Sequence, residues 1–453
     1  MAVTADVNTG FGAGDLGRFA AGLRYESLPD HTVEFTKALV SKIVAAGLAG
    51  STCPAAIRFA ALVQARGLRE DVGVVGSGFK TSLWEAVLAN SFTSHCSELE
   101  DVAHTEGGVS WDITVIPLVL TLGEKLGLSG KAAIEAIAAG LEVHYRSCLP
   151  FDATGIGMVL PPTAAMGCAA AAAKAYGLSA EQTINAMGFS LSCTSMADAS
   201  MGTDAHFFES ALHSLQALIG TEMAAAGLVS NPDLASFAGL YPDGLTLDDA
   251  GAGLSERWLF EAMWIKKYPA CFLVHRQIDA LLEILQEHGL SYADIESVEV
   301  LTGPGEASCD RPEPKTVGDL QFSFQHALGV AMLTGTMALD SVLPSALENV
   351  EFAKARATIG VAIDRELSFS VAMREPTSVT VKAADGREFV RTKGAVKGSP
   401  EDPLSREEFS ELYRRFASAA LSGPQVERTL EIIWSLDELS DIGELTRALT
   451  FPA

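Results

Sequence analysis

The stretch from residue 95 to residue 112 gathers the side chains best suited to chemistry. Its sequence, HCSELEDVAHTEGGVSWD, holds two histidines, His95 and His104, and five acidic residues, Glu98, Glu100, Asp101, Glu106 and Asp112. Imidazoles beside carboxylates can bind a metal ion, transfer protons in catalysis, or only face water in a surface turn. Two adjacent glycines at 107 and 108 would let the loop fold over a cleft.

A metal site is the less favoured of these interpretations. His95 and His104 are nine residues apart and Glu98 follows His95 by three, which matches neither HExxH nor a closed zinc pattern. The sequence also offers no GxGxxG after a strand, no GxxxxGK[ST] and no GxSxG, so nucleotide cofactors and a hydrolase nucleophile lack support. We therefore expect acid/base chemistry without a metal or cofactor.

Histidine suits acid/base catalysis because its pKa lies near neutrality without much tuning. Many histidines only fill a core or a surface, so composition does not choose among them. The candidates are His95, His104, His144, His206, His213, His275 and His326.

Helices are expected to position most of these residues. From about residue 14 to 265 one helical pattern follows another, as at 32–50, where apolar residues recur at helical spacing and Gly50 supplies a stop. The segments 129–146 and 162–177 are so rich in alanine that neighbouring helices could approach closely. Ser179 and Gln182 stand at capping-box spacing.

The pattern changes after residue 267. Ile295, Val298 and Val300 alternate with polar residues in a predicted strand at 293–303, and 378–394 is typical of a hairpin that turns at Asp385 and Gly386. A helix is predicted at 321–335 between them, and the tail at 404–421 is helical again. We predict a mostly α protein: a helical domain from 1–267 and 399–453, and a smaller α+β domain at 268–398.

Composition excludes several classes of partner. The 453 residues carry a formal net charge of -25, which argues against nucleic acid and against anionic lipid. The seven cysteines form no CxxC pair, and the N-terminal residues show no basic region followed by an apolar core. The most apolar run, 164–173, is about half a membrane span. A cytoplasmic protein without a membrane segment is expected.

Several motifs resemble the MmgE/PrpD family in the same order along the chain. They include ANSFTSHCSELED at 89–101, VIPLVLTLGEKLGLSGKAAIEAIAAG at 115–140, KKYPACFLVHRQIDAL at 266–281 and DGREFV at 385–390. The family includes 2-methylcitrate dehydratase, cis-aconitate decarboxylase and iminodisuccinate epimerase. The resemblance implies a large helical domain made from both chain ends, a smaller α+β domain, a cleft between them, a homodimer, and chemistry at a carbon next to a carboxylate.

Four motifs depart from the family pattern. The loop usually written HALDFDDTH keeps His95 and Asp101 but has Glu98 and Val102; the usual HPS motif is replaced by Ser110, Trp111 and Asp112; and the histidine of RGFHPT falls on Pro161. The KRLH motif aligns with HFFE at 206–209, so that His206 replaces a lysine and Phe207 an arginine. These losses of positive charge suggest a less anionic substrate than a tricarboxylate.

The resemblance places His275 on the family's catalytic histidine, with Lys267 and Tyr268 close by. We predict His275 and an opposed His206 as the acid/base pair, with Glu98 and Asp101 tuning an imidazole and His104 substituting for a lost histidine. Predicted substrate contacts are Lys267, Tyr268, His326, Arg311, Phe207 and Ser110, and Arg146 is a weaker candidate for a substrate carboxylate. Arg146 and Arg311 could equally be structural charges.

The leading functional hypothesis is a lyase, either a dehydratase of a hydroxy acid or the related decarboxylase, acting on a small carboxylate. An epimerase with two opposed bases is the first alternative. An inactive relative that only binds a ligand or a protein is the second, suggested by the lost histidines.

Overall fold

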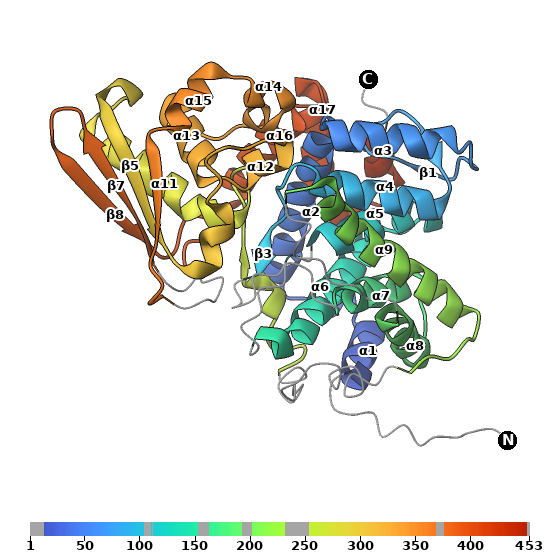
Figure 1. Cartoon of the computed structure of the whole chain (residues 1–453). Helices are drawn as coiled ribbons and strands as arrows, with labels where there is room; N and C mark the ends of the chain where they lie inside the picture. Colours follow the sequence, from blue (N-terminus) through green and yellow to red (C-terminus); the bar gives the residue numbers. More distant parts are fainter. Residues whose placement is uncertain are drawn as a thin grey trace.

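The computed structural model describes residues 13–103, 110, 112–152, 163–192, 202–231, 253–367 and 376–450. These residues form a mostly helical domain and a smaller α+β domain, so the predicted fold class is confirmed. The two lie side by side, with the sheet of the smaller domain at the outer edge (Figure 1). The predictions for His104 and Pro161 lie outside the described residues.

Helices of the first half of the chain build the larger domain. They are α1 Ala13–Gly22, α2 Asp30–Ser51, α3 Pro54–Ala65, α4 Leu83–His95, α5 Asp112–Leu126, α6 Gly130–Asp152, α7 Ala164–Ala175, α8 Ala180–Leu191 and α9 Asp204–Ala225. A two-stranded ribbon, β1 Val72–Gly73 with β2 Lys80–Thr81, precedes α4. Helix α8 begins with the predicted capping box of Ser179 and Gln182.

Close contacts between helices explain why small residues are frequent in these segments. The predicted close approach is seen between α6 and α7, where a Cβ on Gly167 would lie 2.6 Å from the carbonyl oxygen of Gly140. The prediction that Gly50 ends α2 was wrong, because the helix continues to Ser51. Gly50 instead lets α4 approach, since a Cβ there would lie 1.9 Å from the carbonyl oxygen of Thr93.

The chain's last helices return to the larger domain. They are α16 Arg406–Ala417, α17 Gly423–Trp434 and α18 Gly443–Thr450, and α16 packs along α2 (Figure 1). Tyr413 and Phe416 of α16 share one apolar core with Leu39 and Ile43 of α2. Residues from both ends of the chain therefore bury one another.

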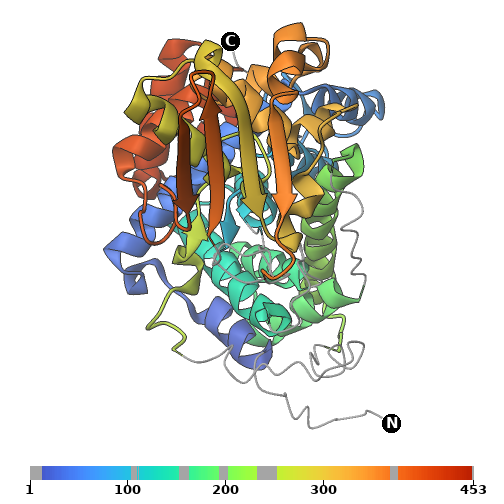
Figure 2. The same ribbon diagram turned by 60° about the vertical axis from the view of Figure 1, so that its left-hand side comes forward.

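The smaller domain is built on a four-stranded sheet in the order β6-β5-β7-β8, seen face-on in Figure 2. Its strands are β5 Ile295–Thr302, β6 Ile359–Ile363, β7 Thr377–Ala383 and β8 Glu388–Lys393. Strand β5 runs parallel to β6 and antiparallel to β7, and β7 and β8 form the predicted hairpin, with Gly386 at φ 88° in the turn. Ile295, Val298 and Val300 are buried, as their alternation predicted.

Helices cover one face of this sheet. Helix α11 His275–His288 packs on β7 and β8, and α13 Phe324–Thr334 packs on β6. Among the described residues of this domain, the other α-helices are the short segments α12 Val317–Gln321, α14 Pro344–Leu347 and α15 Val350–Arg356.

A short pair of strands connects the two halves of the site described below. Strand β3, Val102–Ala103, follows α4 and pairs antiparallel with β4, Met263–Trp264, which leads into the smaller domain. The pairing therefore holds the loop after His95 against the segment that contains Lys266.

No single helix among the described residues has the length and apolar character to cross a bilayer. The bent pair α2 and α3 reaches the length and composition only when taken together, and most of α2 is buried in the core of the larger domain.

Candidate active site

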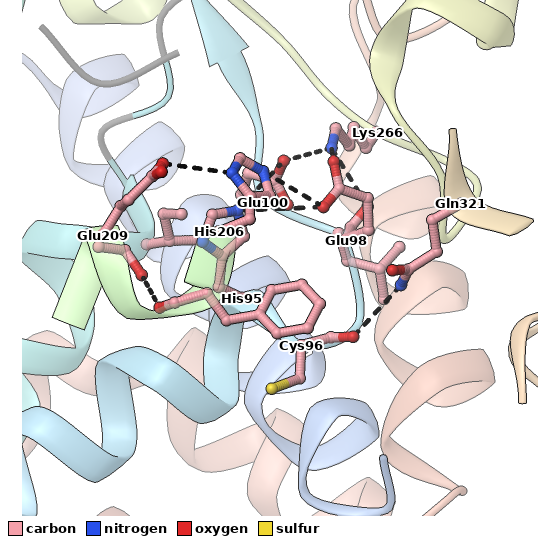
Figure 3. Close-up of polar contacts among 12 residues, drawn as sticks. His95, Cys96, Glu98, Glu100, His206, Glu209, Lys266 and Gln321 are labelled. Atoms are coloured by element: carbon pink, nitrogen blue, oxygen red, sulfur yellow. Dashed lines mark hydrogen bonds and ion pairs between the residues drawn. The ribbon is translucent and has the colours of Figure 1, made fainter. Parts of the chain in front are cut away.

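Four segments bring a polar cluster together between the two domains. His95 is the last residue of α4, Glu98 follows in the next turn, and His206 lies in the first turn of α9. Lys266 and Glu100 complete the cluster from either side of the β3 and β4 pair (Figure 3). All five side chains are at least 98% buried, so charges here interact with little screening by water.

The two imidazoles stand side by side. The ring centroids of His95 and His206 are 4.4 Å apart, with the rings tilted by 54°. Glu98 faces both of them, because its Oε2 lies 3.8 Å from Nε2 of His206 and 4.0 Å from Nε2 of His95. On its other side His206 meets Glu209, with Nδ1 3.3 Å from Oε2 (Figure 3). Within the described part of the chain, neither ring nitrogen of His95 has a hydrogen-bond partner.

The surroundings push the pKa values of the two imidazoles in opposite directions. Burial alone would lower the pKa of His206, but its hydrogen bond to Glu209 and the charge of Glu98 more than compensate and raise it. Burial and the charge of His206 hold the pKa of His95 well below its ordinary value. One ring therefore favours the protonated form and its neighbour the neutral form, which is the arrangement of an acid beside a base.

Lys266 supplies the fixed positive charge. Its Nζ donates to Oε1 of Glu98 at 3.1 Å, to the Glu98 carbonyl oxygen at 3.2 Å and to Oε1 of Glu100. Burial disfavours the ammonium, but the two carboxylates raise the pKa of Lys266 above its ordinary value. Burial and the charge of Glu100 raise the pKa of Glu98. Lys266 thus keeps a carboxylate beside the imidazoles inside the protein.

Glu98 adopts a left-handed backbone conformation, with φ 54°. This conformation costs a non-glycine residue roughly 1 kcal/mol or more. The turn is held by the Glu98 N–H, which donates to the His95 carbonyl at 3.0 Å, and by the bond from Lys266 to the Glu98 carbonyl. The strained turn aims the carboxylate at both imidazoles.

The predicted Lys267, Tyr268 and His275 form a separate group around Asp279 of α11. Lys267 Nζ lies 2.5 Å from one carboxylate oxygen of Asp279, and the Tyr268 hydroxyl donates to the other at 2.7 Å. The His275 ring lies 5.2 Å from the Tyr268 ring and is tilted by 60° to it, with Nε2 3.1 Å from the Ala270 carbonyl oxygen. Burial and the charge of Lys266 keep the pKa of His275 well below its ordinary value. The imidazole beside His206 is that of His95, and a catalytic role for His275 stays a prediction.

Asp101 binds groups that hold the loop after His95 in place. Its Oδ1 lies 3.1 Å from Nζ of Lys42 and accepts the Lys266 N–H at 2.8 Å. Its own N–H donates to both oxygens of Asp112, at 3.2 and 3.3 Å. Burial raises the pKa of Asp101, against the charge of Lys42. These contacts tie Asp101 to the backbone that carries Lys266, and its predicted tuning of an imidazole stays a prediction.

Phe207 and Arg311 border the cluster. The Phe207 ring lies 5.6 Å from that of His95 and lines a cavity of about 410 Å³ at the junction of the domains. The Arg311 guanidinium covers the Phe322 ring at 5.5 Å, and Phe322 in turn contacts His206 edge-on at 5.7 Å. Because Arg311 also pairs with Asp319 at 2.9 Å, much of its charge is already neutralised.

Two other predicted residues, His326 and Arg146, are held by polar contacts of their own. His326 is inside the smaller domain, with Nε2 2.7 Å from the Ser341 carbonyl oxygen, and burial lowers its pKa to about 4. Ser110 is buried, and its hydroxyl has no hydrogen-bond partner among the residues that the structure describes. Arg146 pairs with Glu142 at 2.6 Å and donates to the carbonyl of Arg257, so the structural interpretation fits it better than substrate binding.

Three residues of the cluster could offer ligand atoms to a metal ion. One atom each from His95, Glu98 and His206 lies within 4.8 Å of the other two. No local sequence motif could reveal this set of three ligand atoms, because His206 comes from a helix more than a hundred residues after His95. The sequence analysis gave no site role to Lys266, Glu100 or Glu209. The adjacent lysines at 266 and 267 were the available signal for Lys266, and the acidic run after His95 was the signal for Glu100.

Comparison with known proteins accounts for both halves of this architecture. The MmgE/PrpD N-terminal domain model matches residues 14–240, and the C-terminal domain model matches residues 268–438. The chain belongs to the MmgE/PrpD family. His95, Glu98 and His206 lie inside the first match, whereas Lys266 comes two residues before the second. The cluster is thus built across the junction of the two MmgE/PrpD domains.

The chain is similar over almost its whole length to curated members of the family. It is 25% identical to human cis-aconitate decarboxylase over 95% of this chain and 93% of the human protein. It is 26% identical to the mouse cis-aconitate decarboxylase over 81% of this chain and 78% of that protein. The cis-aconitate decarboxylase of Aspergillus terreus is 23% identical over 99% of this chain and 98% of its own length.

Proposed function

We propose that this MmgE/PrpD protein is a lyase that breaks a bond at a carbon next to a carboxylate, with His206 as proton donor and His95 as its neutral partner. Decarboxylation is the reaction we favour, and dehydration of a hydroxy acid is its close relative. The observation that carries the proposal is the buried pair of imidazoles, 4.4 Å apart, with Glu98 facing both.

The pair supports both halves of such a reaction. In decarboxylation the carbon–carbon bond to the carboxylate breaks, carbon dioxide leaves, and the electron pair remains on the substrate carbon. The proton on Nε2 of His206 then moves to that carbon, and His206 takes a new proton from solvent. In dehydration His95 would accept the proton beside the carboxylate, and His206 would protonate the leaving hydroxyl group. Relatives that carry the name cis-aconitate decarboxylase support the first of the two.

The charges of the site support a less anionic substrate than cis-aconitate, which has three carboxylates. Lys266 is occupied by Glu98 and Glu100, and Arg311 is paired with Asp319. Each further substrate carboxylate would therefore face cations whose charge is already balanced by protein carboxylates. The cost of removing that carboxylate from water would not be offset by a new ion pair. Phe207 contacts the His95 ring and contributes an apolar wall to a neighbouring cavity of about 410 Å³ at the domain junction, which the two imidazoles do not line. We propose an unsaturated or hydroxy acid with one or two carboxylates.

The cluster gives less support to an epimerase. Such an enzyme needs an acid and a base on opposite faces of one carbon, and His95 and His206 stand next to each other on the same side of Glu98. The predicted opposed pair of His206 and His275 would need a substrate that reaches from the imidazole cluster to the group around Asp279.

A panel assay tests the proposed reaction and substrate class. Purified protein is incubated in deuterium oxide with unsaturated and hydroxy acids that carry one, two or three carboxylates. Proton NMR follows substrate loss, and carbon dioxide is measured in the same samples. We expect carbon dioxide release, or an alkene from a hydroxy acid, from mono- or dicarboxylates before tricarboxylates. Deuterium exchange at the α-carbon without either product would support an epimerase instead, and preference for tricarboxylates would contradict the proposed substrate class.

A further inference from the structure

We propose that His95, Glu98 and His206 form a binding site for one divalent transition-metal ion of the Zn²⁺ type. The inference stands on the geometry of these three side chains and does not require the proposed lyase activity. The sequence alone did not predict it, because the spacing of histidines and acidic residues matches no known metal-binding motif.

The distances are close to those of a metal site. Oε2 of Glu98 lies 3.8 Å from Nε2 of His206 and 4.0 Å from Nε2 of His95. A tetrahedral Zn²⁺ with bonds of about 2.0 Å sets its ligand atoms about 3.3 Å apart. To reach this spacing, Oε2 of Glu98 would approach the two imidazole nitrogens by about 0.5 and 0.7 Å. The ligand nitrogens of His95 and His206 lie within 4.8 Å of each other and would approach by up to about 1.5 Å.

The ligand atoms are available. Both ring nitrogens of His95 and Oε2 of Glu98 have no hydrogen-bond partner among the described residues, although both side chains are at least 98% buried. Buried polar groups without partners are uncommon and call for a missing partner such as water or an ion. Oε1 of Glu98 is bound by Lys266, which leaves the other oxygen directed toward the imidazoles (Figure 3).

The surroundings of His206 match those of a metal-binding histidine. Its Nδ1 lies 3.3 Å from a carboxylate oxygen of Glu209, and its Nε2 faces Glu98. Histidines that bind metal through one nitrogen commonly donate the other N–H to a carboxylate, which fixes the tautomer and raises the basicity of the ligating nitrogen. The arrangement orients Nε2 of His206 toward the proposed ion.

The charge balance suits a divalent cation. With both imidazoles neutral, the carboxylates of Glu98, Glu100 and Glu209 contribute -3 and Lys266 contributes +1, which leaves -2 around the site. Two imidazoles and one carboxylate favour Zn²⁺, Co²⁺, Ni²⁺ or Fe²⁺ over Mg²⁺ and Ca²⁺, which prefer oxygen ligands. Three protein ligands leave a coordination position for water or a substrate oxygen.

Metal binding would compete with proton transfer. An ion on Nε2 of His206 takes the place of the proton that the proposed lyase reaction uses, and the same ion occupies His95. We therefore expect the metal-loaded protein to be inactive as an acid/base lyase, so that metal binding and turnover exclude each other.

Titration with Co²⁺ tests the site directly. Full-length protein is treated with a chelator, dialysed, and titrated with Co²⁺ while its visible absorption is recorded. We expect one Co²⁺ per chain with an absorption band typical of a four- or five-coordinate ion, which Zn²⁺ removes because it binds more tightly. The band should be lost in His206→Gln and in Glu98→Gln. It should persist in His213→Gln, which removes a buried imidazole seven residues further along α9.

A substitution at a partly exposed position tests the site with less risk that the variant fails to fold. Glu209 is 19% exposed, so Glu209→Gln should fold, and it should weaken Co²⁺ binding by about 10- to 100-fold. No band in the wild-type protein, an unchanged band in His206→Gln, or equal loss in His213→Gln would overturn the inference. Turnover of the metal-free protein is a separate measurement, so failure of the metal site leaves the proposed lyase activity standing, and the reverse also holds.

Discussion

At the scale of single residues, Lys266 is the cation that makes the buried cluster tolerable. Its Nζ contacts the carboxylates of both Glu98 and Glu100. Lys266→Met would leave these acids buried without their counter-charge, which typically costs about 3–5 kcal/mol. We expect a loss of that size in the free energy of unfolding, measured by urea denaturation and circular dichroism.

The matched control is an exposed pair of the same chemistry. Lys382 and Glu296 lie 2.7 Å apart, with side chains 47% and 52% exposed. Exposed pairs contribute about 0–1 kcal/mol, so Lys382→Met should change the stability little. Equal effects of the two substitutions would mean that burial of the carboxylates near Lys266 costs much less than assumed.

The same residue marks the limit of prediction from sequence. The motif KKYPACFLVH led to the prediction of Lys267 as a substrate contact, whereas the structure places Lys266 in the cluster and Lys267 against Asp279. Adjacent side chains on an extended backbone point to opposite sides, so one sequence does not decide which of two neighbouring lysines faces the cluster. His206 and Glu98, which the motifs suggested, lie together in the cluster, and their catalytic roles stay predictions. The pairing of His206 with His95 was not predicted, since it depends on how α9 packs on α4.

At the scale of elements, the contact between α6 and α7 depends on glycine. Alanine-rich stretches predicted the close approach, and Gly140 and Gly167 face each other there. A Cβ on Gly167 would lie 2.4 Å from the His144 Cβ, so Gly167→Ala must push the helices apart. We expect a loss of about 1–3 kcal/mol in the free energy of unfolding. Gly423→Ala on α17 is the control, because open space surrounds that position; a similar loss in both would contradict this explanation.

The first residue of α5 gives a pH-dependent prediction. A helix N-terminus ordinarily favours a charged acid, yet burial and the nearby charge of Asp101 raise the pKa of Asp112 well above its usual value. The folded protein therefore keeps a proton that the unfolded chain releases above about pH 4, and Asp112 becomes more destabilising as the pH rises. Asp112→Asn resembles the protonated acid and should lose this dependence.

Urea denaturation from pH 4 to pH 8 measures the difference. We expect the stability of Asp112→Asn relative to the wild-type protein to increase with pH over this range. A constant difference would show that the pKa of Asp112 is similar in the folded and unfolded states.

Elements were predicted most reliably where local chemistry determines them. The hairpin at Asp385 and Gly386 and the capping box at Ser179 follow from turn and cap preferences. Gly50 was misjudged because a helix-ending glycine and a glycine at a helix crossing look alike in one sequence. The close approach of α4, which decides between them, is a tertiary contact.

At the scale of the whole molecule, the site is assembled from distant parts of the chain. The two imidazoles come from α4 and α9 of the larger domain, and Lys266 from the segment that enters the smaller one. The resemblance to the family implies a homodimer. We expect light scattering after size exclusion to give twice the chain mass of 47.6 kDa, and a single chain mass at micromolar concentration would contradict this expectation.

The role of His206 as proton donor is tested most directly by comparing two histidine variants on α9. Turnover of the acids identified by the panel assay is followed by proton NMR for the wild-type protein, His206→Gln and His213→Gln. We expect His206→Gln to be slower by about 10²- to 10⁴-fold, the usual contribution of a general acid, while His213→Gln retains wild-type turnover. Turnover by folded His206→Gln at the wild-type rate would contradict the proposed site.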